Sequence, residues 1–465
     1  MTMSSLSVPS DVKKLSFIQS QNNNFYAVFN QGNHYVVPVG SKQLNKVIRE
    51  AEPTLSKYDI AEINEHITAT IEDRGEIKDV YYRIAPINGG IEIDLNDPEN
   101  TRVRITAGKV DILFDGSETL FQRNTVSKPM VLPAPEGNLD FLRKYTNFNA
   151  PNYLMFVAWL SYTLARPKRS TSKYVILVLK GDQGTCKSFL SRYVIQSLLD
   201  PSRAVLQKFP KTVNDLAIAS QHSHVLCFDN LRSFNQEMSD ALCIASTGGT
   251  ISSRALYTNS DQNINHLHVA MVLNGIHDFV RESDLAQRCL VLDMAVLPES
   301  KRKSEEDMVS EFETDLPIIF RGLLDLVANI IKEYPTAEVV HPERMIDFSK
   351  WLAAMEIVDQ VDLGTYQSLY SSLINGAQLD TLMSNPLAVG MLDFCDEISP
   401  CRKWSGTPQE LLEELKVSKD KQLPQNPIAL SKRLNSIKAA LLSQGISIEL
   451  TRGKSRQIKI QILGA

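Results

Sequence analysis

The sequence has few cysteines, no long apolar run and no low-complexity tract, and each absence excludes a class of protein. Its six cysteines are scattered without a CxxC pair, which argues against a disulfide framework and against a zinc ribbon. No apolar run approaches the roughly 18 residues that a membrane-spanning helix needs. Residues 1–10 are polar and lack the pattern of a signal peptide. We therefore expect a cytoplasmic protein with reduced thiols and no membrane partner.

Length and charge predict several domains, one of them basic. The chain has 465 residues, whereas a single core rarely grows beyond about 250 to 300 residues. We therefore expect about two to four domains. The net charge is −5, yet residues 401–465 contain twelve Lys and Arg residues against five Asp and Glu residues. This basic end on an acidic body indicates a local contact with a polyanion.

The first quarter of the chain shows the pattern of strands. Short alternating or β-branched runs are separated by glycine and Asn-Asp turns. These runs are residues 35–37, 80–84, 91–93, 103–105 and 110–114. The proline-rich residues 129–135 predict an extended linker, because proline removes backbone donors and stiffens the chain. The sequence therefore predicts a β-rich N-terminal domain with its linker over residues 1–137.

Beyond residue 137 the periodicity changes. Residues 139–164 have helical spacing, and residues 171–297 alternate strands with helices as a parallel α/β sheet does. Residues 308–385 keep the helical period and lack a strong strand signal. We therefore predict three further domains: an α/β core over residues 138–300, a helical bundle over residues 301–390 and a small domain over residues 391–465.

The strongest motif is a strand, a glycine-containing loop and a helix start over residues 174–199. Such a loop turns backbone N–H groups toward a triphosphate, and the helix N-terminus favours the anion. We predict that Lys187 reaches the β and γ phosphates of ATP and that Ser188 binds Mg²⁺. The residues expected to bind ATP are Gly181, Asp182, Gln183, Gly184, Thr185, Cys186, Lys187 and Ser188.

This loop departs from the pattern GxxxxGK[ST] at one position. Cys186 stands where the second glycine belongs. A small side chain can be accommodated there if the backbone stays in an ordinary region. The alternative is a chance glycine-rich turn between a strand and a helix.

A second apolar strand ends in an acid about forty residues later. Residues 224–228 lead into Asp229, the place where a Walker B strand holds a carboxylate beside the metal. A buried strand that ends in Asp can also start a turn or cap a helix. The neighbouring Asn230 can orient water without deprotonating it, which leaves the general base open. We predict that Ser188 and Asp229 form the Mg²⁺ site.

Two more polar residues mark the strands that follow. The strand over residues 266–274 ends in the amide Asn274, and Arg288 comes directly before the apolar residues 289–292. Arg281 lies a few residues upstream of the same strand. For either arginine, a surface ion pair is the alternative to a functional role.

The order of these motifs resembles the AAA+ helicases of superfamily 3 and the related poxvirus-type and phage primase-helicases. Loop 181–188 is also similar to that of minichromosome-maintenance helicases, which tolerate alanine at the position of Cys186. Residues 344–351 and 404–412 look like ATPases of this group carried by phages and integrated mobile elements. The resemblance covers about residues 140–465. It implies a AAA+ fold, a P-loop NTPase core with helices on both faces of a parallel sheet, in a ring that we expect to be a hexamer.

The same resemblance implies roles for the polar residues. Asn274 would sense the γ phosphate, and Arg288 would complete the site of a neighbouring subunit, with Arg281 as the weaker rival. The catalytic residues are then Lys187, Asp229, Asn230, Asn274 and Arg288. Residues 1–130 show neither a zinc ribbon nor an acidic metal cluster that we recognise, so primase activity is not expected.

Residues 250–263 read as strand, turn and strand. In the helicases that the chain resembles, a hairpin at this place lines the central pore and grips the nucleic-acid backbone. Arg254 and the tip of the hairpin near Asn259 are the candidate contacts to single-stranded DNA. The alternative is an ordinary surface hairpin with an exposed arginine.

The basic end of the chain has the order of a winged helix. Two helices over residues 408–416 and 427–443 precede a hairpin that turns near Gly453. Six basic side chains on the second helix and the hairpin are the candidate contacts to duplex DNA: Lys432, Arg433, Lys438, Arg452, Lys454 and Arg456. A solvated basic face is the alternative.

Together these features predict a AAA+ ATPase that couples ATP hydrolysis to movement on DNA, as the replicative helicase of a phage or mobile genetic element. Replication proteins of the host are expected as further partners. Two alternatives stay open: an origin-binding initiator or loader without processive unwinding, and an ATPase that remodels protein partners in defence.

Overall fold

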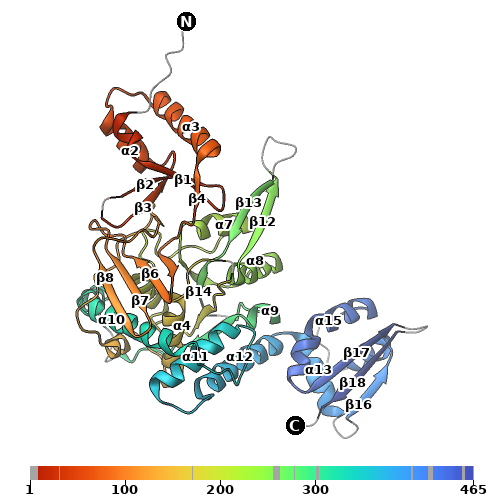
Figure 1. Ribbon diagram of the computed structural model, residues 1–465. Helices are drawn as coiled ribbons and strands as arrows, with labels where there is room; N and C mark the ends of the chain where they lie inside the picture. The colour runs from red at the N-terminus through yellow and green to blue at the C-terminus, as the bar shows by residue number, and fades with distance from the viewer. Residues whose placement is uncertain are drawn as a thin grey trace.

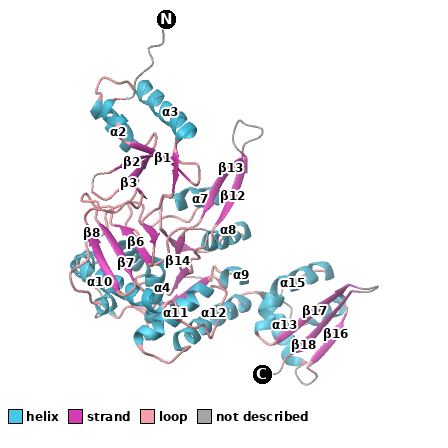
Figure 2. Cartoon of the chain, viewed as in Figure 1, coloured by secondary structure: helices cyan, strands magenta, loops and turns pink. Residues whose placement is uncertain are grey.

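A computed structural model describes residues 9–30, 32–169, 171–254, 262–276, 278–299, 303–398, 402–416, 423–452 and 456–463. Figure 1 shows the chain passing from an N-terminal unit, through a large central body, to a small C-terminal unit that projects from that body. The distribution of helices and strands is shown in Figure 2. Within the described ranges, no helix has the length and apolar character that a membrane crossing requires.

The N-terminal third contains two sheets. The first has the order β4-β1-β2-β3-β9, and the second is the antiparallel sheet β5-β6-β7-β8. Their strands are β1 (Ser16–Ser20), β2 (Phe25–Phe29), β3 (Tyr35–Pro38), β4 (Glu76–Lys78), β5 (Ile84–Ile87), β6 (Gly90–Asp94), β7 (Arg102–Thr106), β8 (Lys109–Leu113) and β9 (Phe121–Gln122). Four of the five predicted runs lie in strands, whereas residues 80–83 lie between β4 and β5, outside both strands.

Three helices accompany the first sheet, and the sequence analysis did not predict them. They are α1 (Ser10–Lys13), α2 (Lys42–Ala51) and α3 (Lys57–Arg74). In α3 the buried residues Ile60, Ile63, Ile67 and Ile71 follow helical spacing, and a capping box at Ser56 begins the helix. These isoleucines pack with buried residues of α2 and of the first sheet in one hydrophobic core. The N-terminal unit therefore contains three helices besides the strands that the prediction of a β-rich domain implies.

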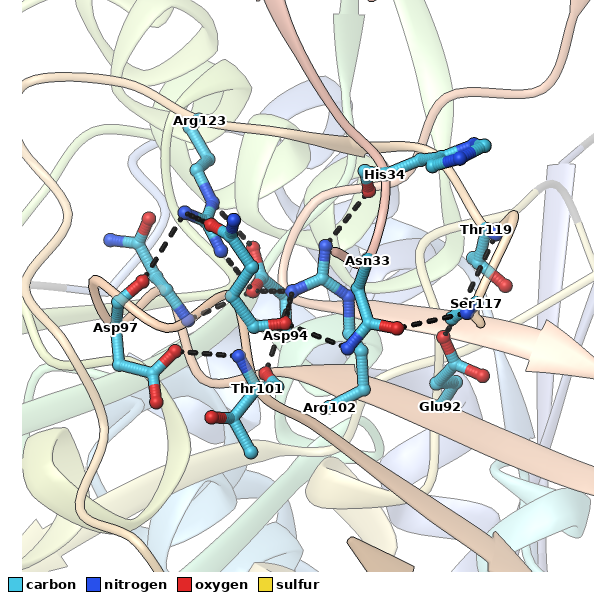
Figure 3. Close-up of polar contacts among 12 residues, drawn as sticks. Asn33, His34, Glu92, Asp94, Asp97, Thr101, Arg102, Ser117, Thr119 and Arg123 are labelled. Atoms are coloured by element: carbon cyan, nitrogen blue, oxygen red, sulfur yellow. Dashed lines mark hydrogen bonds and ion pairs between the residues drawn. The ribbon is translucent and has the colours of Figure 1, made fainter. Parts of the chain in front are cut away.

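A buried network of charges joins the two N-terminal sheets (Figure 3). Asp94 at the end of β6 pairs with Arg102 of β7 and with Arg123, whose Nη2 donates to Asp94 Oδ1 over 2.9 Å. Arg102 Nη2 also donates to the carbonyl oxygen of His34 over 2.9 Å. Burial alone raises the pKa of Asp94, but the two arginines hold it below its ordinary value. These buried charges are paired, as the low-polarity interior requires.

A second buried ion pair joins this region to the central body. Arg83 Nε donates to Asp200 Oδ1 over 3.1 Å, and the hydroxyl of Tyr82 donates to the same oxygen. The other carboxylate oxygen, Asp200 Oδ2, accepts from the backbone N–H groups of His224 and Val225. One carboxylate therefore links the N-terminal region to the start of a strand in the central sheet.

The hydrophobic core is continuous across the domain boundary predicted at residue 137. Apolar residues of β5, β6 and β7 belong to the same core as the central helices. The proline-rich residues 129–135 are not a free linker, because Met130 is buried and its N–H donates to the carbonyl of Leu95. The N–H of Ala134 donates to the carbonyl of Pro317.

The central body is a parallel sheet with helices on both faces. Its order is β11-β14-β10-β15, and all its pairs are parallel. The strands are β10 (Ile176–Lys180), β11 (Val225–Leu231), β14 (Ala270–Gly275) and β15 (Cys289–Asp293). One face packs against α4 (Ala150–Leu164) and the helix over residues 187–199. The other packs against α7 (Val213–Gln221), α8 (Gln236–Thr247) and α9 (Ser283–Ala286). The predicted α/β core is present.

Long helices follow the sheet, as the helical period of residues 308–385 predicts. They are α10 (Glu305–Glu333), α11 (Ile346–Asp359) and α12 (Thr365–Met383). They pack around α4, which is buried nearly throughout its length; the preceding residues form a 3-10 helix, η1 (Leu139–Tyr145).

The C-terminal unit has its own core. It contains α13 (Pro386–Glu397), α14 (Pro408–Lys416), α15 (Pro427–Ser443) and the sheet β16-β18-β17. The strands are β16 (Lys403–Gly406), β17 (Ile446–Arg452) and β18 (Arg456–Ile462). The two helices and the hairpin follow the predicted order, and β16 adds a third strand to the hairpin. Leu430, Leu434, Ile437 and Leu441 of α15 are buried, as their spacing predicts.

Candidate nucleotide-binding site

The glycine-containing loop lies at the carboxyl edge of the parallel sheet. It follows β10 and leads into a helix made of α5 (Lys187–Phe189), a π-helical segment η2 (Leu190–Ile195) and α6 (Gln196–Leu199). The neighbouring β14 and the next strand β11 end at the same edge. Ligands of parallel sheets bind at this edge, where the chain leaves the strands in different directions. A pocket of about 410 Å³ opens there, lined by Gln183, Gly184, Thr185, Cys186, Lys187, Ser188, Phe189, Asp229, Asn230, Ile276, Lys303, Glu305 and Met308.

The loop backbone turns through three residues with positive φ. Gly181 has φ +148°, Gly184 has φ +81° and Cys186 has φ 63°. A Cβ at Gly181 would lie 2.7 Å from the carbonyl oxygen of Met294, so this position excludes a side chain. Cys186 is in the left-handed region, so the condition of an ordinary backbone at this position is not met. A residue with a Cβ in this conformation lowers the stability of the fold by about 1–2 kcal/mol relative to glycine, because the Cβ approaches the following carbonyl oxygen.

Lys187 lies inside the loop that precedes it. Its Nζ donates to the carbonyl oxygen of Gly181 over 2.6 Å, to that of Asp182 over 2.8 Å and to Thr185 Oγ1 over 2.9 Å. These bonds use the three donors of an ammonium group. Burial lowers the pKa of Lys187, and the carboxylates of Asp229 and Asp182 oppose that shift. The ammonium group therefore lies within the loop, where its bonding partners are three oxygens of residues 181–185.

Ser188 and Asp229 meet across the pocket, although 41 residues separate them in the sequence. The hydroxyl of Ser188 donates to Asp229 Oδ2 over 2.7 Å. The other carboxylate oxygen accepts from the N–H of Asn230 over 2.9 Å. Asn230 has φ 56° and an exposed side chain, and the pairing of β11 with β14 is irregular between Phe228 and Leu231. This irregularity turns Asp229 and Asn230 into the pocket.

Asn274 has different surroundings from those the resemblance implies. Its side chain is fully buried and does not line the pocket. Asn274 Nδ2 donates to Ser191 Oγ over 2.9 Å, and that hydroxyl lies 3.2 Å from Asn274 Oδ1. The residue after β14 that does reach the pocket is Ile276, which is 43% exposed.

Arg288 lies at the opposite edge of the sheet from the loop. The parallel register aligns Ile176 with Cys289 and Lys180 with Asp293. Arg288 therefore lies about 13 Å or more from the loop of its own chain, at roughly 3.3 Å per strand residue. Its Nη1 donates to the carbonyl oxygen and to the carboxylate of Asp284, over 2.7 and 2.6 Å.

The two arginines before β15 differ in exposure. The Arg288 side chain is 11% exposed, whereas Arg281 is exposed. Asp284 is shared, because Arg344 Nη1 also lies 2.5 Å from its carboxylate. Arg288 and Arg344 together hold the pKa of Asp284 below its ordinary value against the effect of burial, which raises it.

Sequence reasoning missed the residues that line the pocket from the start of α10. Lys303, Glu305 and Met308 all lie there, and Lys303 Nζ donates to both oxygens of Glu311 over 2.6 and 2.8 Å. Glu305 accepts from the hydroxyl of Tyr193 over 2.8 Å. The charged run that begins at residue 301 was a signal in the sequence, but nothing local shows that it folds back to the loop.

The candidate DNA contacts are partly described. Lys432 and Lys438 on α15 and Arg456 on β18 are exposed, and Arg433 is half-buried. The paired strands β12 (Gly249–Arg254) and β13 (Gln262–Leu267) form the predicted hairpin, which extends away from the central body beside α7 (Figure 1). The side chains of Arg254 and Arg452, and the whole of Asn259 and Lys454, lie outside the described residues.

Two family descriptions match the chain. Residues 139–376 match the family described as actinomycete integrative conjugative element replication protein, and residues 387–464 match the RepA C-terminal domain of the same elements. A comparison with curated proteins finds no match.

Solved structures with a similar arrangement include two proteins. The active helicase SCCmec type IV Cch is 11% identical, with a TM-score of 0.48, over 96% of this chain and 92% of that one. The apo C-terminal region of NrS-1 is 13% identical, with a TM-score of 0.39, over 97% of both chains. Neither likeness is close enough to assign a function.

Proposed function

Because this chain belongs to the replication proteins of actinomycete integrative conjugative elements, we propose that it is a ring-forming ATPase that drives unwinding of DNA when such an element replicates. The observation that carries the proposal is the bond between Ser188 and Asp229 at the end of a glycine-containing loop. This bond brings a hydroxyl and a carboxylate together beside the ammonium group of Lys187. The same three groups bind a nucleoside triphosphate and its metal ion in P-loop ATPases.

The donor set suits MgATP. The loop over residues 181–188 presents backbone N–H groups and a helix N-terminus to the phosphates. The oxygens of Ser188 and Asp229 are hard donors of the kind that Mg²⁺ prefers. When bound, Mg²⁺ would neutralise charge on the β and γ phosphates. Lys187 exchanges its loop carbonyls for phosphate oxygens, and Asn230 orients the attacking water from the exposed side of the pocket.

The catalytic site is completed by a second subunit. Arg288 lies too far from the loop of its own chain to touch the same nucleotide, as the register of β10 and β15 requires. A guanidinium group that stabilises the transferring phosphoryl group can come from a neighbouring chain. We assign this role to Arg288, with Arg281 as the rival because it is exposed. Such sharing is a head-to-tail contact, which forms a ring when the rotation between subunits closes. A hexameric ring is the assembly that we propose.

The DNA contacts lie away from the ATP site. We assign the C-terminal unit as a winged helix that binds duplex DNA through the exposed Lys432 and Lys438 of α15 and through Arg456. The hairpin β12–β13 is the candidate pore element for single-stranded DNA, with Arg254 as its contact. The basic charge of residues 401–465 supports the first assignment.

The test is ATP hydrolysis and strand displacement on a forked duplex, with the full chain. Lys187→Ala abolishes both activities, because the main cation facing the β and γ phosphates is gone. Lys211→Ala is the matched control, since Lys211 is exposed and does not line the pocket. Hydrolysis at the normal rate by Lys187→Ala overturns the site. DNA-stimulated hydrolysis without strand displacement favours the initiator or loader, and hydrolysis indifferent to DNA favours a remodeller of proteins.

A mixing experiment tests the shared site. Arg288→Ala abolishes hydrolysis and still binds nucleotide. Mixed with Lys187→Ala, it regains activity, because some interfaces then combine an intact loop with an intact arginine. If the mixture of Arg288→Ala with Lys187→Ala recovers no activity, whereas the mixture of Arg281→Ala with Lys187→Ala does, the arginine in trans is Arg281.

A further inference from the structure

The helix after the glycine-containing loop carries an unusual polar contact on its buried face. Ser191 is fully buried and meets Asn274, which is also fully buried, over 2.9 and 3.2 Å. Helices that cover a parallel sheet bury mainly apolar side chains, so a paired hydroxyl and amide in this layer calls for an explanation. The pair lies one turn beyond Ser188, which bonds Asp229.

Two neighbouring strands therefore hold the same helix. Asp229 of β11 bonds Ser188, and Asn274 of the adjacent β14 bonds Ser191. The carbonyl of Ser191 also accepts from Cys227 Sγ of β11 over 3.8 Å. Ser191 is thus hydrogen-bonded to both β11 and β14. These bonds fix the position of the first turn of the helix relative to the sheet.

The helix is irregular at this contact. Residues 190–195 form the π-helical segment η2 between α5 and α6. Single π-helical turns are energetically inferior to α-helix and occur frequently at functional sites. Here the wider turn includes Ser191 and follows directly after Ser188 and Phe189.

Asn274 is poorly placed to touch a nucleotide. Its side chain has no exposed surface, and the pocket is lined instead by Ile276 from the same strand end. Turning the amide toward the pocket would leave the buried hydroxyl of Ser191 without its partner, which is unfavourable in the interior. The bond between Asn274 and Ser191 is therefore the arrangement that the interior favours.

We propose that Ser191 is a positioning residue of the ATP site, and that Asn274 acts through it rather than on the phosphates. This inference rests on the proposed function, because the group being positioned is the hydroxyl of Ser188, the Mg²⁺ ligand of that proposal. The pair holds the π-helical turn so that Ser188 stays within reach of both Asp229 and the metal. Loss of either partner lets the turn relax and displaces the hydroxyl.

A double-mutant cycle on the full chain tests this inference. The variants are Ser191→Ala, Asn274→Ala and the double substitution, and the measurements are ATP hydrolysis over a Mg²⁺ titration and binding of ATP without Mg²⁺. Each single variant raises the Mg²⁺ concentration for half-maximal hydrolysis about tenfold, and the double variant shows the same shift rather than the product of two shifts. Binding without Mg²⁺ is unchanged, because the loop N–H groups and Lys187 remain.

The control is Ser246→Ala. Ser246 is a fully buried serine on α8, on the other face of the sheet, where its hydroxyl bonds the carbonyl of Cys243. This change removes the same atom at the same depth and leaves the Mg²⁺ dependence unchanged.

Two results overturn the inference. If Asn274→Ala lowers the maximal rate far more than Ser191→Ala and the effects multiply, Asn274 acts on the phosphates directly. If both variants lower only the unfolding temperature, with the Mg²⁺ dependence of the folded fraction unchanged, the pair is purely structural. If the wild-type chain does not hydrolyse ATP, the proposed function itself is wrong. This outcome distinguishes failure of the proposed function from failure of the inference about Ser191.

Discussion

Acidification from pH 8 to pH 5 should destabilise the protein through two histidines, His224 and His268. The environment of His224 is the simpler to test. The side chain of His224 is fully buried, its Nε2 lies 3.1 Å from the carbonyl oxygen of Thr163, and its Nδ1 has no hydrogen-bond partner among the described residues. The ring also packs edge-on against Tyr174. Burial, reinforced by the nearby Lys168, lowers the pKa of His224 to about 3. Burial and Lys168 likewise lower the pKa of His268 to about 4.

The sign and size of the effect follow from these values. An unfolded histidine has a pKa of about 6.5, so between pH 6.5 and the folded pKa only the unfolded chain binds the proton. Stability therefore falls as pH falls through this window, by about 1.4 kcal/mol per unit and per histidine. At pH 5 the loss relative to pH 8 is about 2 kcal/mol for His224, and about 4 kcal/mol when His268 is included. Carboxylates with lowered pKa values, such as Asp94, contribute their own loss only below about pH 4.

Urea denaturation at pH 8 and pH 5, followed by circular dichroism, measures the loss. The variant His224→Phe fills the same space and cannot be protonated, so its loss should be smaller than that of the wild type by about 2 kcal/mol. The variant His66→Gln is the control, since His66 is exposed on α3. An equal loss in wild type and His224→Phe would refute the assignment of the pH dependence to this buried ring.

Three further predictions concern the loop, the buried ion pair and the C-terminal unit. Cys186→Gly should raise the free energy of unfolding by up to about 1 kcal/mol, because glycine adopts the left-handed conformation without the Cβ penalty; a loss of stability in thermal denaturation contradicts this. Asp200→Asn should cost about 3 kcal/mol in urea denaturation, since Arg83 is then buried without its counter-charge; a change below about 1 kcal/mol argues that the backbone bonds to Asp200 matter more than its charge. Replacing Lys432 and Lys438 by alanine should flatten the salt dependence of duplex DNA binding by about 0.9 per residue in the double-logarithmic slope, as measured by fluorescence anisotropy; an unchanged slope removes α15 from the DNA interface.

Local patterns were sufficient to predict the elements that carry the candidate nucleotide-binding site. The strand of residues 174–180, the glycine-containing loop and the following helix are adjacent in the sequence, and their spacing alone indicates a phosphate-binding turn. The alternation of strands and helices predicted the parallel sheet for the same reason. In the N-terminal region four of the five short β-branched runs predicted strands, and the run over residues 80–84 did not except at Ile84. Helix α3 was missed although Ile60, Ile63, Ile67 and Ile71 have helical spacing.

The sequence by itself determined which residue types gather at the carboxyl edge of the central sheet, because strand ends and turn residues are local properties. Only the tertiary structure decided which of them touch. Three contacts join residues more than 80 positions apart in the sequence. They are the bond of Ser191 to Asn274, the ion pair of Arg83 with Asp200, and the packing of Lys303 beside the loop. No periodicity links such partners, since burial and pairing across a core depend on how whole elements pack. The left-handed backbone at Cys186 is likewise a property of the folded loop, since a cysteine does not by itself indicate a positive φ.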